Sequence, residues 1–466
     1  MKKLLGIVVL GLLWCNISLA DDEHLDDFNQ WLYQSGNHQY LEENECYGCD
    51  DYNTRTIKCL DKNGDPKKQC LLDGKKKDER GFNRWKKAEK YKNKLKIKFY
   101  KDRSNIPWNA KPNYDTLLYY FFSYINRANK GHKVEIKASK KPYEFKFDLK
   151  KDKYINKQMQ KTAIVSYLLF EDGKITIDEK SPKDRFGILI KDDTKLLSMS
   201  VGKSMVSYVL GHAICSGYID NINSKIDDWP LIKNTLYDGQ QIIDLINMSA
   251  GDQKYINVTE RIKKTKKSAG QGSIKYHMES AFIGSKKSKA KWNYNGLIPH
   301  IILNYIQFKS GEDYQKILDQ TFKEKSKIKD SVYFKKQKGK NYDEGLLRNS
   351  FHASRYDYLR ISKAMLDDWQ NDTCVGKYLK TIYKNKVKKN DKWKDEKSSW
   401  FNPKGYAGFF HTDYSGMKKR AVMGMDGYGG QSMIIDFDLG RIIIINSIHP
   451  NYNWKKIAHS VIKKGK

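Results

Sequence analysis

The sequence predicts an α+β fold whose antiparallel sheet is built from both halves of the chain, with a helical region inserted between them. In the first half, "AIVSYLLF" and "KITIDEK" flank the turn Asp172-Gly173. Near the C-terminus, "SMIIDF" and "RIIIINSI" flank Asp438-Leu439-Gly440. Runs of this kind joined by such turns are typical of β-hairpins. The sequence between the hairpins is mostly helical in pattern, so we expect the hairpins to meet in one sheet.

The first 20 residues, MKKLLGIVVLGLLWCNISLA, have the pattern of a secretory signal peptide, with two lysines, an apolar run and small residues at its end. The apolar run is short for a transmembrane span, and acidic residues follow it directly. Cys15 suggests a lipoprotein, but bulky Leu13 and Trp14 stand where a lipidation signal has small residues. We therefore expect a periplasmic or secreted protein without stable membrane insertion.

Residues 21–110 predict a polar, cysteine-stapled N-terminal extension. Four cysteines with the spacing C-x2-C-x9-C-x10-C lie in it, namely Cys46, Cys49, Cys59 and Cys70. This spacing resembles a small zinc site, but in an exported protein two disulfides are favoured, with the pairing open. Cys215 lies in an apolar helical pattern and is expected to be a buried thiol, whereas Cys374 carries no prediction.

The remaining elements follow from periodicity and composition. We expect an apolar helix over 113–131 and a closing helix over 453–465. The segments 259–291 and 384–398 are rich in Lys, Ser and Gly, and we expect them to be exposed loops. The predicted domains are the signal peptide 1–20, the extension 21–110 and one domain over 111–466.

The chain is strongly basic, with 87 Lys and Arg against 55 Asp and Glu and a formal net charge of +32. The lysines form scattered short runs, and no aromatic-plus-Arg pattern for base stacking is present. We therefore expect no nucleic-acid partner, and at most weak association with anionic envelope components.

The stretch "LLSMSVGKSM" contains one complete catalytic motif and two incomplete ones. A nucleophile elbow, G-x-S-x-G, would need glycine where Ser198 stands, and a phosphate-binding loop would need glycine in place of Leu197. The complete motif is S-x-x-K, formed by Ser200 and Lys203.

The S-x-x-K motif lies at the start of a predicted helix. Apolar residues recur with helical period from Val201, and Gly217 ends the pattern. Ser200 is thus expected at the helix N-terminus, with Lys203 one turn along the same face. A neutral lysine can take the proton of a serine nucleophile, and N–H groups at a helix N-terminus can stabilise an oxyanion.

Three segments resemble the serine β-lactamase and penicillin-binding-protein superfamily, and most closely its class C-like branch of esterases, DD-peptidases and aminohexanoate-oligomer hydrolases. They are "SMSVGKSMVSYVLGHAICSGYIDNINSKIDDWPLI", "IIDLINMSAG" and "FHASRYDYLRISKAML". In the last one, Ser354 and Asp357 form a helix-capping box. The resemblance covers about residues 160–466, or 113–466 if the first apolar helix belongs to it. It implies a β-lactamase-like fold, with three motifs in one cleft and no metal or other cofactor.

The resemblance implies that Ser200 is the nucleophile and Lys203 its activator. The second motif is usually Y-x-N, and its best match, "KWNYNGL", makes Tyr294 the proton relay. Gly296 stands at the asparagine position of the family, so Asn295 is the candidate for the contact to a substrate amide.

The third motif is usually K-T-G or H-x-G, and "MDGYGGQSMII" places Tyr428, Gly429 and Gly430 there, with Gln431 next. Glycines let a substrate approach the strand closely. The Gln431 N–H is expected to form the oxyanion hole with the Ser200 N–H. Tyr428 replaces a cation that, in the penicillin-recognising members, engages a substrate carboxylate.

These observations predict an exported serine hydrolase that acts through an acyl-enzyme on an ester or amide of a small substrate. The departures at positions 296 and 428 favour an esterase or amidase, with DD-peptidase or β-lactamase activity as the alternative. A second alternative is a non-catalytic envelope-binding protein on the same fold.

Overall fold

A computed structural model describes residues 132–463 except 184, 257–271, 340–341, 390–402, 415–416, 418, 450–451 and 453–454. The predicted signal peptide, the N-terminal extension with its four cysteines and the helix predicted over 113–131 lie outside the described residues. The predicted domain boundary near residue 110 also lies there and stays a prediction.

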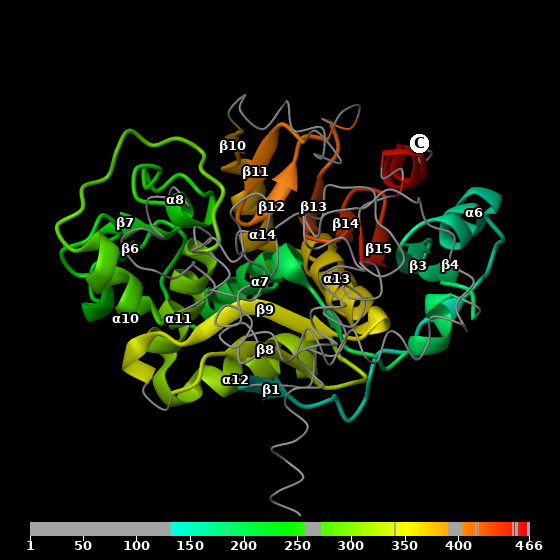
Figure 1. The fold of residues 1–466 in the computed structure, drawn as a ribbon, viewed down its shortest axis with the longest axis horizontal. Coiled ribbons are helices and arrows are strands. Elements are labelled where there is room, and N and C mark those ends of the chain that lie inside the picture. Colours follow the sequence, from blue (N-terminus) through cyan, green and yellow to red (C-terminus); the bar gives the residue numbers. More distant parts are fainter. Residues whose placement is uncertain are drawn as a thin grey trace, which may run out of the picture. The chain divides into compact units, whose positions relative to one another are not determined.

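The main sheet has nine strands in the order β10-β11-β12-β13-β14-β15-β3-β4-β2 (Figure 1). The strands are β2 (Lys146–Phe147), β3 (Ile164–Glu171), β4 (Lys174–Lys180), β10 (Val387–Lys388), β11 (Gly405–Ala407), β12 (Phe410–Thr412), β13 (Val422–Gly427), β14 (Gln431–Asp436) and β15 (Arg441–Ser447). At its centre β15 pairs antiparallel with β3, which places Ile444 opposite Leu168. The sheet is therefore built from both halves of the chain, as predicted, and β2 pairs in parallel with β4.

Both predicted hairpins are present. Asp172 and Gly173, with φ of 50° and 76°, form the two-residue turn between β3 and β4. A type I′ turn needs positive φ at both positions, which Asp and Gly tolerate. The second hairpin joins β14 to β15 through a turn that ends at Gly440, whose φ is 65°. Local turn chemistry thus accounts for both hairpins.

Helices cover both faces of the main sheet. Along β3, Tyr167 and Leu169 face one apolar cluster and Leu168 and Phe170 face the other, which is the period-two alternation of a strand. The first cluster includes α6 (Lys153–Lys161) and the closing helix, which consists of a π-helical turn, Lys455–His459, and α15 (Ser460–Lys463). The second includes α7 (Gly202–Cys215), α13 (Arg355–Gln370) and α14 (Cys374–Lys384).

The inserted region between β4 and β10 contains helices, as expected, and also three of the four strands of a second sheet. Its remaining helices are α8 (Ile242–Ile246), α10 (Ile274–His277), α11 (Ile298–Ser310) and α12 (Tyr314–Leu318). The second sheet has the order β1-β8-β9-β5, from β1 (Lys133–Ile136), β5 (Leu196–Leu197), β8 (Val332–Lys336) and β9 (Leu347–Ala353). A short pair joins β6 (Lys225–Ile226) to β7 (Gln240–Gln241). In Figure 1, α7 lies between β9 and the C-terminal strands of the main sheet.

Two predictions about the inserted region were wrong. Cys215 is not a free buried thiol: at the end of α7 it forms a disulfide with Cys374, the first residue of α14, with a Cα–Cα distance of 5.8 Å. The segment predicted as a loop over 259–291 contains α10 and a π-helical turn, and Ile274 and Phe282 are fully buried. Composition alone did not show this burial because apolar residues are sparse between the lysines. Of the other predicted loop, 384–398, the described part contains the end of α14 and edge strand β10.

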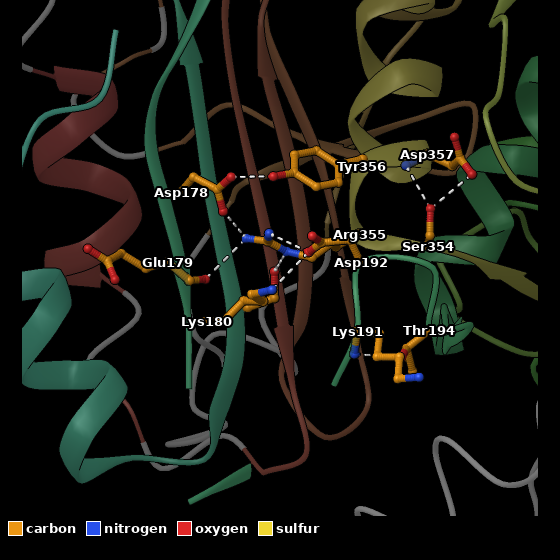
Figure 2. A network of polar contacts seen from close by, with 11 residues as sticks. Asp178, Glu179, Lys180, Lys191, Asp192, Thr194, Ser354, Arg355, Tyr356 and Asp357 are labelled. Atoms are coloured by element: carbon orange, nitrogen blue, oxygen red, sulfur yellow. Dashed lines mark hydrogen bonds and ion pairs between the residues drawn. The ribbon is translucent and has the colours of Figure 1, made fainter. Parts of the chain in front are cut away.

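A buried arginine fastens the start of α13 to the main sheet. Arg355 donates to Ser166 on β3 (2.7 Å), to Asp178 on β4 (2.5 Å) and to Asp192 in the loop before β5 (3.2 Å) (Figure 2). Ser354 caps α13, since its Oγ accepts from the Asp357 N–H and donates to the Asp357 carboxylate. The Arg355 contacts thus tie the start of α13 to β3, β4 and the loop before β5.

Candidate active site

A strained turn presents Ser200 at the start of α7. A 3-10 turn, Met199–Val201, leads directly into the helix, and Met199 has a φ of 48°, a conformation that non-glycine residues rarely adopt. The preceding residue holds the turn on β9: Ser198 N–H donates to the Phe351 carbonyl (2.9 Å), and Phe351 N–H donates to Ser198 Oγ (3.0 Å). The sequence did not reveal this anchoring role of Ser198.

Gly202 is required because the helix start lies against β9. A Cβ atom at this position would overlap the Asn349 carbonyl oxygen and lie 2.7 Å from Ser198 Oγ. The glycine of the S-x-x-K motif therefore permits a close approach between α7 and β9.

The structure brings the serine and lysine of the motif into direct contact. Lys203 Nζ donates to Ser200 Oγ at 2.8 Å, and Lys203 is only 4% exposed. Within the described part of the chain, no carboxylate forms an ion pair with Lys203. No ion pair has to be broken, therefore, for a proton to pass between the two side chains.

Tyr294 joins this pair from the loop before α11. Lys203 Nζ lies 4.6 Å from the centroid of the Tyr294 ring, which is within cation–π range. The ring stacks on His411 at 6.3 Å and meets Tyr406 edge-on at 6.1 Å. The first two sequence motifs therefore meet at one place, as expected for a common site.

Asn295 is not placed to bind a substrate amide, because its own amide is saturated within the chain. Its Nδ2 donates to the Asp252 carboxylate and to the Asn293 carbonyl, both at 3.1 Å. Its Oδ1 accepts from the N–H groups of Leu297 and Ile298 at the start of α11. An asparagine side chain offers two donor hydrogens and one acceptor oxygen with two lone pairs, and all are in use.

The third predicted motif forms the turn between β13 and β14, beside the nucleophile turn. Gly429 and Gly430 adopt φ values of 79° and 101°, and Tyr428 is 36% exposed. A Cβ atom on Gly427, the last residue of β13, would lie 2.7 Å from the Ser198 carbonyl oxygen. Gln431 is buried, and its side-chain amide donates to the Ser447 carbonyl and accepts from Asn446 Nδ2.

Three further groups, two against the Tyr294 ring and one over the Trp292 ring, were not identified from the sequence. His411 and Tyr406 are direct partners across the β11–β12 ladder. Burial, reinforced by the charges of Lys389 and Lys203, holds the pKa of His411 well below its usual range, so His411 is neutral. Burial lowers the pKa of Lys389 to about 8, and its Nζ lies 5.3 Å from the Trp292 ring. The stretch "GYAGFFHT" has no recognisable motif, and the pairing of β11 with β12 brings Tyr406 and His411 together beside Tyr294.

The described residues contain no group of three or more His, Cys, Asp or Glu side chains arranged to hold a metal ion. In the same part of the chain, no helix is both long and apolar enough to cross a membrane. Cys46, Cys49, Cys59 and Cys70 lie outside the described residues, so the disulfide and zinc alternatives for them stay predictions.

Comparison with known proteins identifies the fold. No family model and no curated protein matches the sequence. Among solved structures, a candidate 6-aminohexanoate-dimer hydrolase from Bacillus anthracis matches with a TM-score of 0.55 and 12% identity, over 75% of this chain and 96% of that one. A candidate beta-lactamase from Bacteroides dorei DSM 17855 matches with a TM-score of 0.49 and 12% identity, over 66% and 95%. A penicillin binding protein from Bacillus halodurans matches with a TM-score of 0.47 and 9% identity, over 67% and 100%. The likeness to the first of these, together with the sheet order and flanking helices, shows that this chain has the β-lactamase-like α+β fold.

Proposed function

We propose that this protein is a serine hydrolase that acts through an acyl-enzyme on an ester or amide of a small substrate. The observation that carries the proposal is the 2.8 Å hydrogen bond between Lys203 Nζ and Ser200 Oγ, beside the Tyr294 ring. A nucleophile within hydrogen-bond reach of its base, with a third group next to the base, is the arrangement that covalent catalysis needs.

In the proposed reaction, each residue of the site acts at a defined step. Lys203 Nζ takes the Ser200 proton while Oγ attacks the substrate carbonyl. The N–H groups of Ser200 and Gln431 stabilise the oxyanion, since the β13–β14 turn lies beside the nucleophile turn. Tyr294 assists protonation of the leaving group, and water then hydrolyses the acyl-enzyme.

Two features favour an ordinary ester or amide over a β-lactam or a D-alanyl peptide. No cation stands at Tyr428, where the penicillin-recognising members engage a substrate carboxylate, and the Asn295 amide is committed to internal hydrogen bonds. Two substrate contacts that the family resemblance implies are therefore missing for the DD-peptidase or β-lactamase alternative.

We also propose that the protein is exported and works in the periplasm or outside the cell. The signal-peptide pattern of residues 1–20 supports this, and the Cys215–Cys374 disulfide suits an oxidising compartment. Weak association of the basic surface with anionic envelope components belongs to the same proposal.

The non-catalytic alternative predicts that Ser200 and Lys203 lie out of hydrogen-bond reach of each other. The 2.8 Å distance between their side chains supports catalysis instead.

The test is covalent labelling of the full chain with a fluorophosphonate probe. We expect one modified residue, Ser200, and no labelling of Ser200→Ala. The matched control is Ser207→Ala, which removes another α7 hydroxyl whose partner is Tyr378 Oη at 2.9 Å, and it should label normally. Labelling that persists in Ser200→Ala overturns the proposal. Rates with nitrocefin, p-nitrophenyl esters and short amides then identify the substrate class, and rapid nitrocefin turnover would contradict the esterase or amidase preference.

A further inference from the structure

Both residues next to Tyr294 in the chain donate to the same buried carboxylate. Asn293 Nδ2 donates to Asp252 Oδ1 at 3.0 Å, and Asn295 Nδ2 donates to Asp252 Oδ2 at 3.1 Å. Asp252 is fully buried and lies 42 positions before Tyr294, counting from 252 to 294 in the sequence. A tyrosine whose two neighbours are tethered to one anchor has little freedom to move its backbone.

We propose that Asp252 is a positioning residue whose carboxylate holds the segment 293–295 so that the Tyr294 ring stays against Lys203. The inference rests on the proposed function, because it concerns a residue of the same site. It explains why asparagines stand on both sides of Tyr294 although neither needs to contact a substrate.

The anchor must be a group that only accepts hydrogen bonds. A third donor, the Tyr237 hydroxyl, lies 3.0 Å from Asp252 Oδ2, so three donors converge on one side chain. An ionised carboxylate can accept all three, whereas an amide of the same shape would turn one acceptor into a donor that faces another donor. Burial raises the pKa of Asp252, and the donated hydrogen bonds oppose that rise by stabilising its ionised form.

The segment is also held from two other directions. Asn295 Oδ1 accepts from Leu297 N–H (3.0 Å) and Ile298 N–H (3.1 Å), which fixes the segment to the first turn of α11. Asn293 N–H donates to the Met248 carbonyl at 2.7 Å, which fixes it to the loop after α8. Asp252 accepts from the residues on both sides of Tyr294, so its loss should release the segment on both sides.

The test compares Asp252→Asn with Asp357→Asn, by crystallography and by the rate of fluorophosphonate labelling of Ser200. Asp357 is an equally buried carboxylate at the start of α13, and its hydrogen-bond partners lie elsewhere. We expect the crystal structure of Asp252→Asn to show the Tyr294 ring displaced from Lys203 while the Ser200–Lys203 hydrogen bond remains. Labelling should fall at least about 10-fold in Asp252→Asn, and by less than about 2-fold in Asp357→Asn.

A double-mutant cycle separates positioning from general stability. If Asp252 acts through Tyr294, adding Asp252→Asn to a Tyr294→Phe background should lower labelling by less than about 2-fold further. An equal loss in both backgrounds, or an undisplaced Tyr294 ring in the Asp252→Asn crystal structure, overturns the proposal. If Asp252→Asn does not fold, Asn293→Ala removes one tether and should show the same dependence on Tyr294. If the wild-type chain does not label at all, the proposed function fails, and the position of the ring alone decides the role of Asp252.

Discussion

Replacing Gly202 with alanine tests whether close packing of α7 on β9 sets the geometry of the proposed nucleophile. Two effects of this substitution oppose each other. Alanine is favoured over glycine in a helix by about 0.5–1 kcal/mol. The added methyl group, however, would overlap the Asn349 carbonyl oxygen and lie 2.7 Å from Ser198 Oγ. Asn349 belongs to strand β9, and Ser198 Oγ is held by the Phe351 N–H.

The clash should prevail over the helix preference. Overpacking of this kind costs about 1–3 kcal/mol or more, and it exceeds the propensity gain because a backbone atom cannot rotate away. Relief requires a shift of α7 on the order of 1 Å, and a displacement of about that size at a catalytic group lowers rates about 100-fold. We therefore expect Gly202→Ala to lose at least about 2 kcal/mol of unfolding free energy and about two orders of magnitude in Ser200 labelling.

The assays are urea unfolding followed by circular dichroism and the labelling rate constant at a temperature where the variant is folded. The matched control is Gly211→Ala on the same helix, where the nearest atoms belong to the Tyr378 ring and not to the backbone. This control should be mildly destabilised and label at the wild-type rate. A Gly202→Ala variant with wild-type stability and wild-type labelling would refute the reasoning.

Three further predictions concern stability. Asp178→Asn leaves the buried Arg355 guanidinium with only the half-exposed Asp192 carboxylate, and urea unfolding should show a loss of about 3–5 kcal/mol. Asp192→Asn keeps the better buried Asp178 partner and should lose about 0–1 kcal/mol; equal losses would contradict this. Replacing both Cys215 and Cys374 with serine removes a cross-link between residues 159 positions apart. In non-reducing buffer the unfolding free energy should fall by about 2–5 kcal/mol. Under reducing conditions the variant and the wild type should have the same unfolding free energy. Burial raises the pKa of Asp426 to about 6, so the native state keeps a proton that the unfolded chain has lost, and wild-type stability should fall as pH rises from about 4 to 6. Asp426→Asn should remove that part of the pH dependence, and an unchanged profile would show that the carboxyl titrates normally.

The parts of the fold that were predictable depend on residues close together in the chain. The Asp172-Gly173 turn specifies its hairpin through positive φ at two consecutive positions, and the apolar period from Val201 specifies α7. Ser200 and Lys203 are three residues apart, so one helical turn is enough to bring them together. For the same reason their contact could be anticipated without knowledge of the rest of the fold.

Other features could not be predicted because their partners are distant in sequence. The Cys215–Cys374 disulfide depends on the packing of α7 against α14, and the second sheet pairs β1 with β8 across about two hundred residues. The amide of Asn295 could have faced a substrate until Asp252 and the start of α11 were seen to occupy it.

The sequence by itself determined the two hairpins, the nucleophile helix and the serine–lysine pair, because turn chemistry and helical periodicity act over a few residues. Only the tertiary structure decided what surrounds that pair. The aromatic groups of Tyr406 and His411, the tether at Asp252 and the close approach at Gly202 all arise where segments far apart in the chain pack together. Such contacts depend on how the two sheets and their helices are assembled, which no local pattern specifies.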